Sequence, residues 1–377
     1  MSLVKGLNKN ASLVYVVSFS LLFCFVACNK KQKVNSGGVQ VYADTLVIDI
    51  PSFTSSNLVR PTVWQEDQIE YLAAYNYLDH SLSIFNLTDE TYFKRTSLDR
   101  QGPHFVDAIG AMSFDVDSKC FIVVNYQWIT LINLEGKVLK RLKINNGTQN
   151  DLEGIDFEEY ELYYNQYSGL QFDQVSKKFL LGVASLNRRH PQRDTTSRLA
   201  EIDLTNNSIV PLDIKMSNDF TELPGDYGEL TRIGFWRKGS GIVFNFAMSA
   251  KVFIKESDSL MVYDNESTLL DNLAQPMKGG GSWNKNRIEH QLYSQAFYPM
   301  VYNKHQDIYG QVQKTDSRSS SEDYYGLFFY DEHLNLIREI EFPENYYIFS
   351  IVSKRGLMFM SFNKHDDKLE LVRYNLR

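Results

Sequence analysis

The sequence predicts an all-β fold, a six-bladed β-propeller of four-stranded antiparallel blades. From residue 41 onward it carries no long apolar repeat of 3.6 residues, while short aromatic and β-branched runs recur between turn residues. An apolar residue followed by Asn or Asp also ends such a run six times, at intervals of about 44 to 70 residues. This repeat indicates stacked blades, because one four-stranded blade cannot bury both of its faces. A pair of β-sandwiches is the alternative, and it explains the strands without explaining the repeat.

The first element along the chain is an export signal, which we assign to residues 1–27. A short basic segment precedes an apolar run at residues 11–27, and Cys28 follows directly after Ala27. As a helix this run would span about 26 Å, which suits a signal peptide and is short for a membrane span. The pattern resembles a bacterial lipoprotein signal, although Phe25 stands where Leu is usual. The resemblance implies cleavage after Ala27 and a diacylglyceryl anchor (palmitate among its acyl chains) on Cys28, with an uncleaved membrane anchor as the alternative.

A polar tether follows at residues 28–40, and the propeller is expected at residues 41–377. After export and lipidation Cys120 is the only thiol left, so no internal disulfide can form. Cys120 lies in an apolar strand-like run, which indicates a buried and inert thiol. The residues after Cys28 are basic, which favours the periplasmic side of the bacterial cell envelope over the cell surface.

The six blades follow in order along the chain. We expect them at residues 68–98, 109–144, 168–214, 230–273, 292–342 and from 347 onward. Their repeated motifs are Phe85-Asn86-Leu87, Ile132-Asn133-Leu134, Ile202-Asp203-Leu204, Tyr263-Asp264, Tyr330-Asp331 and Tyr374-Asn375-Leu376. The sixth blade is one strand short, whereas residues 45–50 form a strand without a blade. We therefore expect residues 46–50 to pair with residues 369–375 and close the ring, which removes exposed sheet edges.

The loop that joins the first two blades reads Arg100-Gln101-Gly102-Pro103-His104. With this loop, the lipoprotein signal and six blades, the chain resembles the uncharacterised six-bladed-propeller lipoproteins of gut Bacteroidota, a domain-of-unknown-function family. Members of that family often carry a Gly-Pro pair at this place. The resemblance covers residues 28–377. It implies the fold and a location in the cell envelope, and it supplies no catalytic residue.

The sequence carries no recognisable motif for a metal, a cofactor or a catalytic nucleophile. No two of the seven His have metal-ligand spacing, and Asp115-Val116-Asp117 lacks the rest of a calcium loop. The glycines of residues 278–282 are not followed by the Lys of a phosphate loop, and no Gly-x-Ser-x-Gly elbow is present. We therefore expect no metal and no cofactor. The formal net charge of −7 disfavours a nucleic-acid partner, because an acidic surface repels phosphate.

Two classes of function are compatible with these features. The first is a lipid-anchored binding or scaffold module for a glycan, a peptide or a partner protein, and we expect it to be monomeric. The second is an enzyme of the lactonase or glycan-lyase type, with catalytic residues that converge in the axial channel. Four Trp and 23 Tyr, without a compact set of His and carboxylates, favour binding over catalysis.

Strand direction predicts which end of the propeller would bind. In a four-stranded blade, the connection between blades and the loop between the second and third strands leave from the same end. The long segments at residues 145–167, 187–198, 272–291 and 314–323 all belong to these two kinds of connection. Aromatic and cationic side chains on this face suit sugars or anionic groups. The predicted binding residues are Arg100, His104, Tyr163, Tyr164, Arg189, Trp283 and Arg287.

Overall fold

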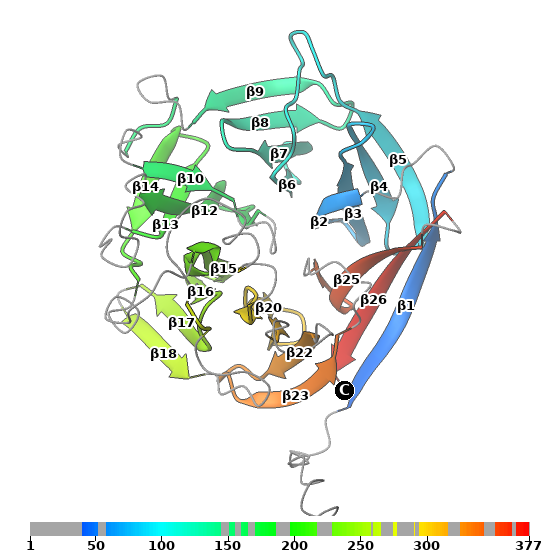
Figure 1. The fold of residues 1–377 in the computed structure, drawn as a ribbon. Coiled ribbons are helices and arrows are strands. Elements are labelled where there is room, and N and C mark those ends of the chain that lie inside the picture. Colours follow the sequence, from blue (N-terminus) through cyan, green and yellow to red (C-terminus); the bar gives the residue numbers. More distant parts are fainter. Residues whose placement is uncertain are drawn as a thin grey trace, which may run out of the picture. The chain divides into compact units, whose positions relative to one another are not determined.

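The structure is a computed structural model of the chain, and it confirms the predicted six-bladed β-propeller. It describes residues 40–51, 58–144, 151–154, 160–164, 170–185, 197–216, 228–257, 259–264, 274–276, 290, 294–315, 325–342, 351–363 and 367–376. The chain forms two compact units, Met1–Val39 and Gln40–Arg377, and the first lies outside the described residues. The second unit is a ring of six antiparallel sheets around a central axis (Figure 1). A search of the described residues for a helix able to cross a membrane finds none.

Each blade has four strand positions, from an inner strand at the axis to an outer strand (Figure 1). Blade one holds β2 (Leu58–Glu66), β3 (Ile69–Asn76), β4 (Ser81–Asn86) and β5 (Thr91–Ser97), and blade two holds β6 (Ala111–Asp115), β7 (Cys120–Val124), β8 (Trp128–Asn133) and β9 (Val138–Lys143). Blade three holds β10 (Tyr160–Tyr163), β11 (Phe172–Asp173), β12 (Lys178–Ser185), β13 (Leu199–Asp203) and β14 (Ser208–Leu212). Blade four holds β15 (Ile233–Lys238), β16 (Gly241–Phe246), β17 (Lys251–Glu256) and β18 (Ser259–Asp264), preceded by the short 3₁₀ helix η2 (Gly228–Thr231). Blade five holds β19 (Ala296–Phe297), β20 (Val301–Asn303), β21 (Ile308–Lys314), β22 (Tyr325–Tyr330) and β23 (Leu336–Glu341), and blade six holds β24 (Ile351–Ser353), β25 (Gly356–Asn363), β26 (Lys368–Leu376) and β1 (Val41–Asp49).

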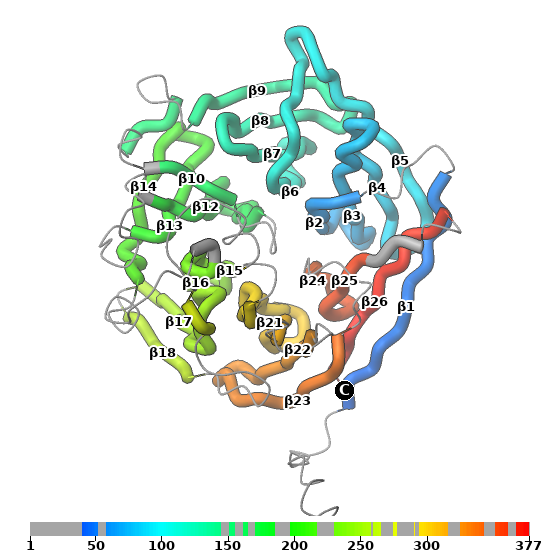
Figure 2. The backbone as a smooth tube through the Cα atoms, in the orientation of Figure 1, coloured from blue at the N-terminus to red at the C-terminus, as the bar shows by residue number. Residues whose placement is uncertain are grey.

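The N-terminal strand closes the ring, as predicted. Strand β1 is the outer strand of blade six and pairs antiparallel with β26, from Val41 opposite Leu376 to Asp49 opposite Lys368 (Figure 2). Alternate β1 residues, including Leu46 and Ile48, are buried against blades six and one. The strand begins at Val41, five residues before the predicted position 46. The prediction missed its first half because those residues are exposed and carry no apolar alternation.

Two blades begin earlier than predicted, because their inner strands are irregular. Blade one starts with β2 rather than at residue 68, and a register shift between Val59 and Thr62 interrupts the apolar alternation of that strand. Blade three starts with β10 rather than at residue 168. Its inner strand is divided into β10, with four residues, and β11, with two residues. Pieces this short show no strand pattern in the sequence.

The repeated Asn or Asp is a turn residue. In blades one, two, three and five it lies at the end of the third strand, and its side-chain oxygen accepts hydrogen bonds from backbone N–H groups farther along the turn. In blade one, for example, Oδ1 of Asn86 accepts from the backbone N of Thr88 at 2.9 Å and of Asp89 at 3.0 Å. The motifs of blades four and six are exceptions, because Tyr263-Asp264 ends the outer strand β18 and Asn375 lies within β26, where it pairs with Tyr42 of β1. The repeat therefore reports the fold and not a binding site.

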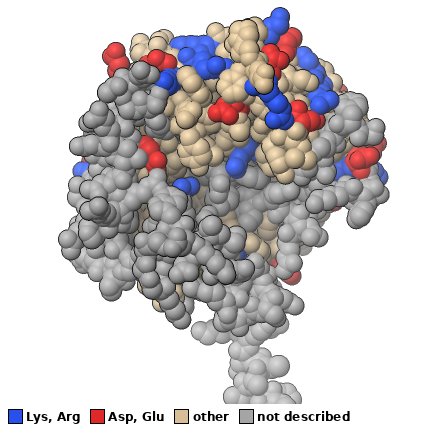
Figure 3. All heavy atoms as spheres, turned by 45° about the horizontal axis from the view of Figure 1, so that its top comes forward, with Lys and Arg blue, Asp and Glu red and all other residues tan. Residues whose placement is uncertain are grey.

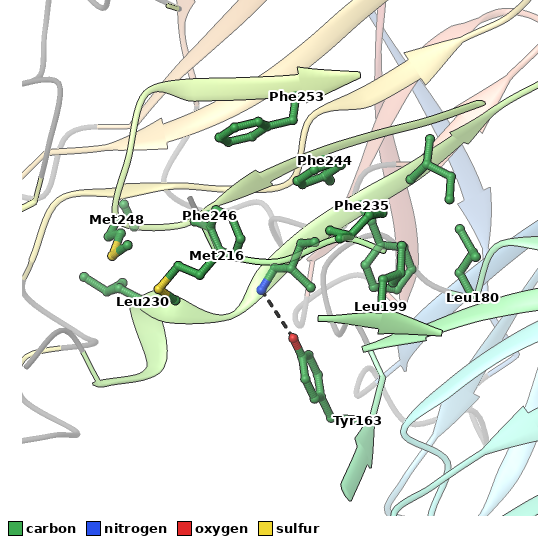
Figure 4. Packing of buried hydrophobic residues seen from close by; sticks show 14 of the residues in the cluster. Tyr163, Leu180, Leu199, Met216, Leu230, Phe235, Phe244, Phe246, Met248 and Phe253 are labelled. Atoms are coloured by element: carbon green, nitrogen blue, oxygen red, sulfur yellow. Dashed lines mark hydrogen bonds between the residues drawn. The ribbon is translucent and has the colours of Figure 1, made fainter. Parts of the chain in front are cut away.

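The core consists of apolar clusters on the blades and between neighbouring blades. Figure 4 shows one such cluster, in which Tyr163 of blade three packs with phenylalanines of blade four. In that cluster the rings of Phe244 and Phe253 stack with their centroids 5.0 Å apart. Cys120 is fully buried and unpaired, as predicted, and burial raises the pKa of its thiol to about 11.

The strand order gives the propeller two unlike ends. We call the end that carries the connections between blades and between second and third strands the long-loop face. The tight-turn face is the opposite end, with turns such as Glu135-Gly136 and Asn206-Asn207. Val41 pairs with Leu376 at the tight-turn face, so the chain enters the ring at that end.

Candidate binding site in the axial channel

The inner strands β2, β6, β10 with β11, β15, β19 with β20, and β24 surround the axis. Several of them depart from regular strand geometry halfway along the channel. Strand β2 has its register shift there, and the inner strands of blades three and five are each split in two. Pro299 lies in the break of blade five, and Gly234 lets it approach closely, since a Cβ on Gly234 would lie 2.8 Å from the Pro299 ring.

A cluster of aromatic and cationic side chains lies toward the long-loop face. The rings of Tyr126 and Tyr164 have centroids 5.2 Å apart, and the guanidinium of Arg60 lies 5.7 Å from the centre of the Tyr164 ring. Gly110 makes room for this ring, because a Cβ there would lie 2.2 Å from it. Burial, together with the neighbouring Tyr126 hydroxyl, raises the pKa of Tyr164 to about 12, so its hydroxyl stays neutral at physiological pH.

A cavity of about 600 Å³ occupies the channel at the tight-turn face. All six blades contribute to it through the second half of their inner strands and the turns that follow. The residues used in the argument below are Trp64, Glu70, Asp173, Arg237, Lys304 and Lys354. The volume lies within the roughly 300–1,000 Å³ of typical small-molecule sites.

The two carboxylates that line the cavity are already occupied by hydrogen-bond donors. Glu70 is 7% exposed, and its carboxylate accepts from the hydroxyl of Ser353 at 2.7 Å and from the backbone N of Lys354 at 3.0 Å. Asp173 accepts from the backbone N of Val175 at 3.0 Å and from the hydroxyl of Ser176 at 2.6 Å. These carboxylates thus hold the ring and its turns together, an arrangement that suits a structural role better than proton transfer.

Several hydrogen-bond donors of the cavity wall are not satisfied in this way. Trp64 is 7% exposed, and its indole N–H has no acceptor among the described residues. Nε of Arg237 is likewise buried without an acceptor in the described structure, although its Nη2 donates to Glu201 at 2.9 Å. Lys304 and Lys354 are exposed at the mouth of the cavity, and no described carboxylate lies within ion-pair distance of either ammonium group.

Polar contacts join every pair of neighbouring blades around this cavity. They are Lys119–Glu66, Lys177–Asp115, Arg237–Glu201, Lys238–Tyr309, Gln306–Asn375 and Ser353–Glu70. Burial alone would raise the pKa of Asp115 and of Glu201, but hydrogen bonds from their cationic partners outweigh it, and both pKa values are lowered. On the side shown in Figure 3, Lys and Arg side chains lie among Asp and Glu side chains over the described surface. The six contacts thus connect all six blades in a ring around the cavity.

The structure describes four of the seven predicted binding residues. Arg100 and His104 lie in the loop between blades one and two, where the exposed Arg100 donates to the carbonyl of Leu78 at 2.9 Å and His104 is half-buried. Tyr164 belongs to the aromatic cluster toward the long-loop face. Tyr163 is 7% exposed, its ring packs in the core, and its hydroxyl accepts from the backbone N of Ile233 at 3.3 Å (Figure 4).

The predicted binding residues Arg189, Trp283 and Arg287 lie outside the described residues, as does the predicted lipidation site Cys28. For these positions the sequence-based prediction stays a prediction. No group of three or more His, Cys, Asp or Glu is placed to hold a metal ion within the described ranges.

Sequence reasoning missed the residues of the tight-turn cavity. Blades two to six each carry a Lys at the end of the inner strand or in the turn that follows: Lys119, Lys177, Lys238, Lys304 and Lys354. These lysines occupy different positions in their turns, so they form no repeat that the sequence would reveal. Whether each Lys contacts a neighbouring blade depends on packing.

The fold and the cavity define a class, a closed six-bladed β-propeller with a small-molecule-sized cavity at one end of its axis. The chain belongs to the family described as "Domain of unknown function (DUF4221)", whose model matches residues 33–341. A crystal structure of a DUF4221 family member from Bacteroides vulgatus is similar over 92% of this chain and 99% of its own, with 20% identity and a TM-score of 0.71. A putative exported protein from Bacteroides fragilis is similar over 89% of this chain and 95% of its own, with 8% identity and a TM-score of 0.54. No curated protein sequence matches the chain.

Proposed function

We propose that this protein is a non-catalytic binding module that holds a small molecule in the tight-turn cavity. The observation that carries the proposal is the wall of that cavity, where both lining carboxylates accept hydrogen bonds from the protein on each oxygen, while Lys304 and Lys354 have no ion-pair partner in the described structure. Carboxylates held by donors of the protein are less available for proton transfer, whereas ammonium groups without an ion-pair partner can bind an acceptor of a ligand. The rigid frame of contacts between blades would keep the cavity open in the absence of ligand.

We further propose that the domain is anchored in a bacterial envelope through a lipid on Cys28, on the periplasmic side. The support is the apolar run that ends at Ala27 and the polar tether of residues 28–40.

The anchor is tested by metabolic labelling with a palmitate analogue in a bacterial host that processes lipoproteins. Wild-type protein should be labelled and found in the membrane fraction, and Cys28→Ala should be unlabelled. Cys24→Ala, which alters the neighbouring thiol, should leave the labelling unchanged. Equal labelling of wild type and Cys28→Ala would show that the anchor assignment is wrong.

The binding function is tested by thermal-shift screening of the soluble domain from residue 29 with monosaccharides, oligosaccharides and small organic acids. Val175 lines the mouth of the cavity and is 92% exposed, so Val175→Trp should narrow the mouth without disturbing the core. Val210→Trp is the matched control on outer strand β14 of the same blade, where the side chain is 54% exposed. A compound that raises the melting temperature of wild type should do so in the control but not in Val175→Trp. No stabilising compound, or equal shifts in both variants, would contradict the proposal.

A further inference from the structure

We propose that the ligand of the tight-turn cavity is a small organic anion whose acidic group lies at Lys304 and Lys354. The inference rests on the proposed binding function and narrows it to a chemical class. Its basis is which charged groups around the cavity already have a partner, and which hydrogen-bonding groups the cavity wall presents to a ligand.

The first argument comes from the five lysines that end the inner strands or follow them. Three of them are committed to the neighbouring blade: Lys119 to Glu66, Lys177 to Asp115 and Lys238 to the hydroxyl of Tyr309, each at 2.7 Å. Lys304 of blade five and Lys354 of blade six each follow directly after the inner strand of their blade, line the same cavity, and have no ion-pair partner in the described structure. Two lysines on neighbouring blades are therefore left without an ion-pair partner among the described residues, and both lie at the mouth of the cavity.

The second argument is independent of these lysines. The cavity wall also carries the cationic guanidinium of Arg237, which can only donate hydrogen bonds. The lining carboxylates Glu70 and Asp173 already accept hydrogen bonds on both oxygens. A ligand rich in acceptors and carrying negative charge fits this wall, and a donor-rich cation does not.

His305, which follows Lys304 in the sequence and also lines the cavity, supports the same conclusion. Burial lowers the pKa of His305, the ammonium groups of Lys304 and Lys354 lower it further, and the carboxylate of Glu70 opposes them without reversing the shift. His305 is therefore neutral at pH 7 and leaves the two lysines as the cations of this part of the mouth. An acidic group placed there would meet two ammonium donors, the geometry in which charge-assisted hydrogen bonds are strongest.

The test uses the soluble domain from residue 29 and four probes in isothermal titration calorimetry: D-galacturonate, citrate, inorganic phosphate and neutral D-galactose. We expect at least one acidic probe to bind more tightly than galactose, and Lys304→Gln or Lys354→Gln to weaken its binding about tenfold each. Lys304→Arg should retain binding. Lys137→Gln is the matched control, because Lys137 is exposed on the same face in an outer turn. Comparing the affinities for D-galacturonate and citrate with the affinity for inorganic phosphate shows whether the site prefers a carboxylate or a phosphate.

Two results would overturn the inference. One is that no acidic probe binds the wild type more tightly than galactose, and the other is that Lys304→Gln with Lys354→Gln leaves the affinity for every acidic probe unchanged. If neutral sugars bind in a manner that Val175→Trp abolishes, the binding function survives and only the anionic class is wrong. If Val175→Trp has no effect on any ligand that binds, the proposed function fails as well.

Discussion

Closure of the ring by β1 can be tested at two adjacent residues with opposite surroundings. Ile48 is 1% exposed and packs against blades six and one, whereas its neighbour Val47 points outward and is 44% exposed. Ile48→Ala removes buried methyl groups and leaves a cavity, so it should lower the free energy of unfolding by about 2–5 kcal/mol. Val47→Ala should cost less than about 1 kcal/mol, because it removes only a preference for strand geometry at an exposed site.

The two variants share a backbone and differ in the side of the strand that is changed, which makes them a matched pair. Urea unfolding of the soluble domain, followed by tryptophan fluorescence, gives both free energies, and an unchanged slope would show that the unfolded states are comparable. Equal losses for the two variants would refute closure by β1, because the strand would then have no buried side.

Truncation gives the upper limit of the same effect. Removing the chain through Pro51 strips Leu46, Ile48 and Ile50, which are 5%, 1% and 6% exposed. At about 1.5–3 kcal/mol for each buried aliphatic side chain, the loss is about 5–9 kcal/mol. Because a domain has only about 5–15 kcal/mol of stability, the truncated ring should be unfolded or aggregated. The ion pair between Asp44 and Arg373 adds little, since Asp44 is half exposed.

Two further predictions concern packing and pH. Gly182→Ala should destabilise the domain by about 1–3 kcal/mol, because the added Cβ would lie 2.2 Å from the ring of Tyr163; a melting temperature equal to wild type would contradict this packing. The pKa of Asp115 is lowered in the folded state, so its pairing with Lys177 stabilises the domain above the unfolded pKa of about 4 and is lost as pH falls through the folded value. Asp115→Asn should therefore be less stable than wild type at pH 7, and the difference should shrink in acid; a difference independent of pH would rule out the ionic contribution.

The sequence by itself determined the features that depend on neighbours along the chain. Turn residues such as Asn86 and Asp331 act within four residues of themselves, so their repeat reports the number of blades without any knowledge of packing. The missing strand of blade six and the unused strand at the N-terminus likewise predicted closure of the ring. The buried state of Cys120 followed from the apolar run around it.

Only the tertiary structure decided where the cavity lies and which residues line it. Glu70 meets Ser353 across 283 positions of sequence. Lys119 and Lys177 have ion-pair partners because the neighbouring blade presents Glu66 and Asp115, whereas Lys304 and Lys354 have none among the described residues. The irregular inner strands, with few residues and interrupted alternation, gave no periodic signal of their own. The physical reason is that turn formation is local and leaves a pattern in sequence, whereas the radial packing of blades joins distant segments whose side chains carry no mark of their partners.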